Sequence, residues 1–227
     1  MKKRLFYREL VYLAAILTMA FGAACMEHAG FGLSMVIAPA YLLHCALMPM
    51  LSWFSFGMAE IAFQATLLIL MCLILRRFRF SYLFSFVTTV IYGFCLDGAI
   101  VLIEHLPYTL GVRLLLYVAG MALTSAGVAF FCRTYIAPEV YELFVEKISR
   151  KLQKPFHHFK TVYDCLSCLL SLILSFALFG WGEFVGINWG TVVCALVNGK
   201  LIRGFEKFYY RLWRFEDKFP KLRRIMP

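Results

Sequence analysis

Two apolar stretches near the end of the chain decide the fold: FKTVYDCLSCLLSLILSFALFG (159–180) and VGINWGTVVCALVNGKLIRGF (185–205). Each is close to the roughly 20 residues that an α-helix needs to cross a bilayer. Lys160 and Asp164 lie four residues apart near the start of the first stretch, and so on one face of a helix. The second stretch begins at a Gly/Asn turn and ends among basic residues. Together they predict a pair of membrane-spanning helices.

The composition extends this prediction to the whole chain. Of the 227 residues, 62% are hydrophobic and 16% are charged, and the mean hydropathy is +0.77. A soluble domain is closer to half apolar and a quarter charged. We therefore expect one integral membrane domain over residues 1–227. The net charge of +10 fits loops that lie on anionic lipid rather than a nucleic-acid partner.

Six stretches have the length and hydropathy of a membrane span. Two further segments, 27–52 and 134–158, follow the first and the fourth of them. Segment 27–52 is apolar but broken by glycines and prolines, which predicts a re-entrant or interfacial segment. Segment 134–158 has apolar residues at helical spacing from Val140 on, which predicts an amphipathic helix in the interface that ends before Pro155. The predicted spans are about 9–26, 53–75, 81–103, 112–132, 160–180 and 185–204.

Lysines and arginines gather on one side of this topology. With the N-terminus inside, the inner segments 1–8, 76–80, 133–160 and 200–227 hold 22 of the 23 lysines and arginines, and Arg113 alone falls outside. This distribution follows the positive-inside rule. It predicts an even number of spans with both termini in the cytoplasm.

The two halves of the chain have the same order of elements. Residues from about 9–104 and from about 112–205 each run span, proline-containing insert, span, span, and IAPAY (37–41) corresponds to IAPEV (136–140). An odd number of spans per copy turns the copies in opposite directions, as in many secondary transporters. We therefore expect an all-α polytopic membrane fold, with six transmembrane helices in two inverted three-helix repeats and a basic cytoplasmic tail over 206–227.

Five segments of the chain match a known family pattern. They are GFGLS (30–34) with the following APAY, YGFCLD (92–97), IAPE (136–139), FKTVYD (159–164) and VGINWGTVVCALVNGKLI (185–202). Through them the chain resembles the YczE/YitT-like bacterial integral membrane proteins, in particular the YczE-type branch without a soluble tail. The chain differs from the family pattern at Met35, where a proline is usual, and at Asn188, in a turn that is otherwise richer in glycine. The resemblance implies a helical fold in the bacterial cytoplasmic membrane and, at most, a role in transport.

Polar residues within the spans are the candidates for binding a substrate or an ion. Ionisable groups are costly inside a membrane, so each is either functional or held by a partner. Glu60 could couple a proton or cation, or be a carboxylic acid hydrogen-bonded across helices. Asp97 could bind substrate or cap the interface. Broken backbone is tolerated at membrane depth where it lines a cavity, and this adds the glycine-rich segments. The candidates are Glu60, Gln64, Asp97, Asp164, Asn198, Gly32, Ser34 and Asn188.

Two further candidates also have a structural interpretation. Asp164 and Lys160 could form a local ion pair on one helix. Asn198 could hydrogen-bond to another helix or line a cavity.

The sequence contains no pattern that predicts an enzyme, a metal site or a cofactor. Cys165 and Cys168 are one helical turn apart, and no second pair or spaced histidines accompany them. Phosphate-binding, nucleophile-elbow and zinc-protease motifs are absent from the sequence. We predict a small-solute transporter or permease whose partners are the lipid bilayer and an unknown solute. The alternative is a non-transporting membrane subunit or scaffold that works with a partner protein. A homodimer or a partner subunit is a further candidate assembly.

Overall fold

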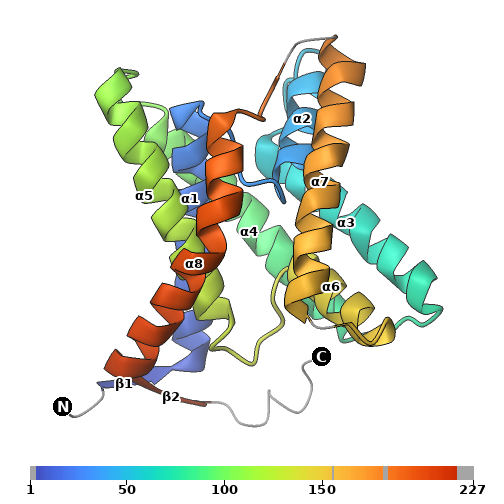
Figure 1. Cartoon of the computed structure of the whole chain (residues 1–227), viewed down its shortest axis with the longest axis vertical. Coiled ribbons are helices and arrows are strands. Elements are labelled where there is room, and N and C mark those ends of the chain that lie inside the picture. The colour runs from blue at the N-terminus through green and yellow to red at the C-terminus, as the bar shows by residue number, and fades with distance from the viewer. Residues whose placement is uncertain (1–3, 155, 181–183, 219–227) are drawn as a thin grey trace.

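The computed structural model describes residues 4–154, 156–180 and 184–218, and Figure 1 shows their arrangement. The chain is α-helical in these ranges, apart from one pair of four-residue strands. The helices and strands are β1 (Arg4–Tyr7), α1 (Arg8–Ala29), α2 (Ala38–Leu47), α3 (Phe56–Leu75), α4 (Tyr82–Ile103), α5 (Leu110–Phe131), α6 (Val140–Lys151), α7 (Phe156–Phe179), α8 (Trp189–Leu212) and β2 (Trp213–Glu216).

Five of the helices, α1, α3, α4, α5 and α7, are long and apolar enough to cross a membrane. At 1.5 Å per residue, 20 to 24 residues cover the roughly 30 Å of hydrocarbon. Their outer surfaces are apolar, as at Ile69 and Leu73, whose side chains are 63% and 68% exposed. The sixth predicted span overlaps α8, which is equally long but is not among these five helices, because it carries Lys200, Arg203 and Lys207 from its midpoint on. These charges make α8 less apolar than the other five.

The two inserts each contain a short helix. In the first, Gly30 ends α1 in the left-handed conformation (φ 66°), and α2 follows with Pro39 in its first turn. In the second, the predicted amphipathic helix is present as α6. Its apolar residues are buried against α3 and α7, so its amphipathic pattern serves packing within the protein.

The helices form two groups, and in Figure 1 helices α1, α5 and α8 lie on the left, helices α2, α3, α6 and α7 lie on the right, and α4 runs between them. The first group contains α1, α4, α5 and α8, and its most extensive contact joins α1 to α5. The second group contains α2, α3, α6 and α7. Helix α4 connects the groups through α3 and α6. Any polar group between α4 and the second group is therefore inside the molecule.

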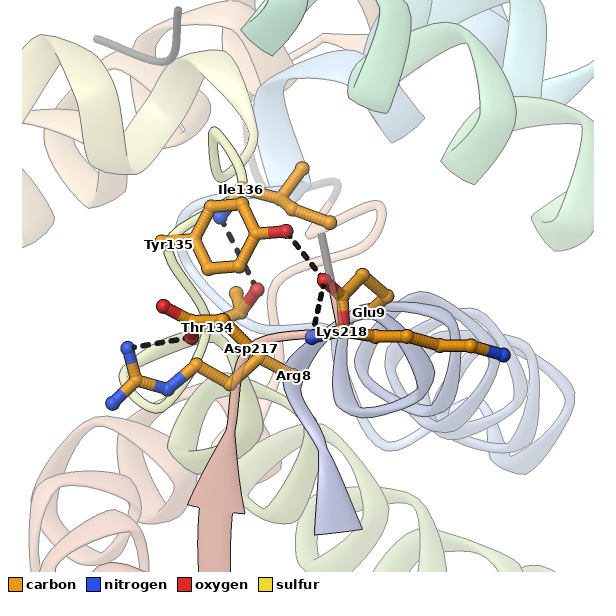
Figure 2. Close-up of polar contacts among 7 residues, drawn as sticks. All are labelled: Arg8, Glu9, Thr134, Tyr135, Ile136, Asp217 and Lys218. Atoms are coloured by element: carbon orange, nitrogen blue, oxygen red, sulfur yellow. Dashed lines mark hydrogen bonds and ion pairs between the residues drawn. The ribbon is translucent and has the colours of Figure 1, made fainter. Parts of the chain in front are cut away.

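The two ends of the described chain meet at one end of the molecule. Strands β1 and β2 pair in parallel, with Arg4 opposite Trp213 and Tyr7 opposite Glu216. Figure 2 shows the polar contacts beside them: Arg8 pairs with Asp217 at 3.1 Å, and the Glu9 carboxylate accepts hydrogen bonds from the Tyr135 hydroxyl and the Lys218 amide. The predicted tail over 206–227 thus begins as the end of α8 and β2, while residues 219–227 lie outside the described part.

Candidate functional site

Two buried glutamates face one glutamine inside the protein. Glu60 and Gln64 are four residues apart in α3 and therefore on one helix face. The Gln64 Nε2 donates to Glu60 Oε2 at 3.2 Å and to Glu139 Oε2 at 3.1 Å. Tyr141 donates its hydroxyl to the same Glu60 oxygen at 2.9 Å. All four side chains are at most 3% exposed. The structure thus brings the two predicted residues together and adds Glu139 and Tyr141.

The carbonyl oxygen of the Gln64 side chain accepts two hydrogen bonds. Its Oε1 accepts from the Thr89 hydroxyl at 2.7 Å and from the backbone N–H of Val140 at 3.1 Å. Neighbouring Thr88 donates to the Ala137 carbonyl, which fixes the loop before α6. Gln64 therefore joins α3, α4 and α6, and its orientation is set by two donors and two acceptors.

The acidic pair has neutral partners. No salt bridge among the described residues involves Glu60 or Glu139, and one oxygen of each, Oε1, is buried without a hydrogen-bond partner. Burial raises the pKa of Glu139 well above its usual value, and the nearby carboxylates of Glu142 and Glu60 raise it further. Burial also raises the pKa of Glu142, although Lys160 opposes this. The pair therefore favours retention of a proton.

The two glycine-containing segments, one from each half of the chain, lie against each other. Leu33 N donates to the Gly186 carbonyl at 3.1 Å, and Gly190 N donates to the Phe31 carbonyl at 3.0 Å. Gly32 has φ 104°, and a Cβ there would lie 2.5 Å from the Thr191 Oγ1. This position requires glycine both for its backbone conformation and for the close approach.

A polar cavity of about 140 Å³ lies between these segments. Asn188 lines it and also begins α8, where its side chain accepts from Trp189 N and its own N–H donates to Thr191. Ser34 is one residue beyond lining residue Leu33 and is not itself in the lining. The volume is several times the roughly 30 Å³ that one water molecule occupies in the liquid, so the cavity can hold a small polar solute. Its lining residues are Met26, Glu27, Gly30, Gly32, Leu33, Tyr41, Phe184, Gly186 and Asn188.

The remaining candidates have local partners outside both sites. Asp97 accepts from the Ser55 hydroxyl at 2.5 Å and from Gly57 N at 2.7 Å, so it caps the start of α3. Asp164 pairs with Lys160 at 3.6 Å. Asn198 accepts from Ser125 at 2.7 Å and so joins α8 to α5. These contacts agree with the structural interpretation of each residue.

Glu139, Tyr141, Glu27 and Tyr41 are site residues that were not among the sequence candidates. Glu139 was placed in the first turn of a helix, where acids are common, so nothing local distinguished it. Glu27 and Tyr41 line the cavity, and both lie in the insert that was expected to be irregular. The available signal for Glu139 was its place in IAPEV, the counterpart of IAPAY.

These groups are suited to holding a polar solute and a proton. Within the described ranges, no three His, Cys, Asp or Glu side chains converge as a metal site. The cavity offers a carboxylate, a phenol, an amide and backbone groups, and the acidic pair offers a place for a proton.

Together, the apolar helices and the buried polar sites define a multi-helix membrane-embedded protein. Residues 6–207 match DUF6198, a family of unknown function, and the chain belongs to that family. No curated protein and no solved structure matches the chain.

Proposed function

We propose that this protein is a transporter for a small solute, with the cavity between residues 30–34 and 186–190 as the solute site. One observation carries the proposal: two irregular backbone segments, one from each half of the chain, enclose a polar cavity among apolar helices. Irregular backbone at membrane depth is tolerated where it lines a cavity. In many secondary transporters such segments bind the substrate at the interface of two repeats.

The packing of the helices supports the inverted three-plus-three repeat. If α1, α2, α3 and α4 correspond to α5, α6, α7 and α8, several contacts pair up: α1 packs on α4 as α5 packs on α8, and α2 packs on α7 as α6 packs on α3. The contact of α3 with α4 has no comparable counterpart between α7 and α8 in the described residues. The helices α1 and α5, which correspond to each other, form the most extensive contact. Inverted repeats of this kind occur in many secondary transporters.

The meeting of the two chain ends supports six crossings. After an odd number of spans the chain would end on the opposite side from its start, yet β1 and β2 are paired (Figure 1). In this proposal α8 is the sixth span, with Lys200 and Arg203 near its inner end, and both termini are cytoplasmic. The resemblance to YczE/YitT-like proteins supports the bacterial cytoplasmic membrane as the location.

The cavity can be tested with one pair of glycine substitutions. Purified protein is screened by thermal shift against a panel of amino acids, amines, sugars and carboxylates, because a compound that binds the folded state raises Tm. The compound with the largest shift is then used in counterflow with protein in liposomes. In Gly32→Ala we expect loss of the shift and of counterflow, since the new Cβ would collide with Thr191.

The matched control is Gly199→Ala, because a Cβ at Gly199 meets nothing within 4 Å. This variant keeps both the thermal shift and counterflow. If no compound in the panel shifts the wild type and none moves in counterflow, the transporter proposal is wrong.

A membrane subunit that needs a partner is the alternative, and the second half of α8 favours it. Its basic residues are exposed, they have no ion-pair partner among the described residues, and their spacing places them on one helix face. An acidic cytoplasmic protein fits such a stripe. Retention of a specific protein in mild detergent, lost when the stripe is neutralised, supports this function, whereas unaided counterflow argues against it. The stripe is Lys200, Arg203, Lys207 and Arg211.

A further inference from the structure

We propose that Glu60 and Glu139, which lie on either side of Gln64, form a single proton-binding site. The two carboxylates share one proton. Both side chains are at most 1% exposed, and each has one oxygen, Oε1, without a hydrogen-bond partner. Two ionised carboxylates so placed would repel each other with no cation to compensate. With one carboxylate and one carboxylic acid, this repulsion is removed.

The donors around the pair favour a proton over a metal cation. The Gln64 Nε2 lies between the two Oε2 atoms and donates to both, so an N–H group occupies the position that a bridging cation would take. The orientation of Gln64 is fixed, because its Oε1 accepts from Thr89 and Val140. Hard cations require several oxygen ligands, whereas a proton needs only one unpartnered carboxylate oxygen.

The proton step involves no other reactant. A proton from water adds to the ionised carboxylate and forms one O–H bond, and the same bond breaks when the proton returns to water. The titratable and charged groups around the pair come from every element packed near it. They are Tyr12 of α1, Tyr92 of α4, Tyr141 and Glu142 of α6, and Tyr163 of α7, with Lys160 and Asp164 of α7 next to Glu142.

The site is located where a change of protonation would move helices. Gln64 ties α3 to α4, which belongs to the other helix group, and to the start of α6. Loss of the proton leaves two negative charges around one amide, which drives α6 away from α3. The role of this proton as the coupling ion rests on the proposed transport function. The proton site itself does not depend on transport.

The experiment is an infrared titration of purified protein in detergent, which needs no ligand. A protonated carboxylic acid has its own C=O stretching band. We expect this band to persist from about pH 5, above the usual glutamate pKa of about 4.3, toward neutral pH. In Glu60→Gln and Glu139→Gln, the remaining acid loses its negative neighbour, so the midpoint falls by at least about one pH unit. In the double variant, this component of the band is absent.

Thermal unfolding gives a second readout. The folded protein binds the proton more tightly than the unfolded chain, so Tm falls as pH rises above the unfolded glutamate pKa through the folded midpoint. In each single variant Tm falls less steeply with pH. The double variant lacks the part of this fall that Glu60 and Glu139 cause. Both substitutions keep the side-chain size and remove a buried charge, so we expect folded protein.

Two control variants separate the possible outcomes. Asp97→Asn, an acid outside the network, leaves the band and the Tm profile unchanged. Loss of the band in Glu142→Gln but not in the double variant would assign the proton to Glu142 and overturn the proposal. Absence of the band in wild type above about pH 5 would also overturn it, even if a variant failed to fold. A normal band without counterflow of any compound would leave the proton site standing and reject the transporter.

Discussion

Glu60 in α3 and Asp164 in α7 are both acids in long apolar helices, but their surroundings differ. Asp164 is one helical turn from Lys160, and each side chain of this pair is 26% exposed. Glu60 is fully buried, and its partners are an amide and a phenol. A cation compensates the first acid in place. Glu60 instead depends on a hydrogen-bond network that extends through three helices. Its effect on stability is therefore shared with residues far away in the sequence.

The difference indicates which acid can change its protonation state. An ion pair at a partly exposed position favours the ionised form at neutral pH. A buried acid with neutral donors and a second acid nearby has no such preference. Asp97 is a third acid, and it accepts hydrogen bonds from a hydroxyl and a backbone N–H at the start of α3. Substitutions at these three acids or at their partners test how much each environment contributes.

The largest effect is expected for Gln64→Leu. This substitution removes the donor to both glutamates and the acceptor for Thr89 and Val140, all of which are buried. Buried groups without partners cost about 1–3 kcal/mol each, and because the losses are not additive we expect about 3–5 kcal/mol of lost stability. The measurement is denaturant unfolding in detergent. Thr66→Val is the control, because the Thr66 hydroxyl bonds only to Ala62 of its own helix and is exposed. Near-native stability of Gln64→Leu would show that the hydrogen bonds of Gln64 contribute little to the stability of the fold.

A smaller effect is expected for Asp97→Ala. Its carboxylate accepts from Gly57 N and Ser55, so its loss leaves the Gly57 N–H without its acceptor, while Ser55 still caps Met58 N. Removal of a capping side chain costs about 0.5–2 kcal/mol. We expect a loss in this range by the same unfolding assay. The pH profile that belongs to Glu60 and Glu139 is expected to stay unchanged. A change in the pH profile would mean that Asp97 belongs to the same titrating system.

Most of the helices were predictable from the sequence because their patterns are local. Apolar runs of about 20 residues gave α1, α3, α4, α5 and α7 to within a few residues, and helical spacing of apolar residues gave α6. Strands β1 and β2 were not predicted. Each has only four residues, and no local sequence pattern indicates pairing with a strand about 200 residues away. The same limit applies to the packing of α6, since the sequence shows an apolar face but not which surface covers it.

The candidate site was predictable only in part. Glu60 and Gln64 stood out because polar residues are rare in apolar helices, and Gly32 and Asn188 because glycine and asparagine break them. That the two glycine segments face each other is a tertiary fact. Glu139 precedes an ordinary amphipathic helix, where an acid is expected for local reasons. Its burial arises from the contact of α6 with α3, which no local pattern records.

The smallest effect is expected for Lys160→Met, which removes the cation that pairs with Asp164. The ion pair with Asp164 has a spacing of i,i+4, a distance of 3.6 Å and partial exposure. Such pairs contribute about 0.3–0.5 kcal/mol and are weakened by salt. We expect a loss of this size for Lys160→Met, the same loss for Asp164→Asn, and no additional loss for the double variant, as unfolding at low and high salt can show. If Lys160→Met instead cost as much as Gln64→Leu, Asp164 would be an acid that needs its cation to remain buried. The neutral environment of Glu60 would then be one of two solutions for a buried acid in this fold rather than the mark of a proton site.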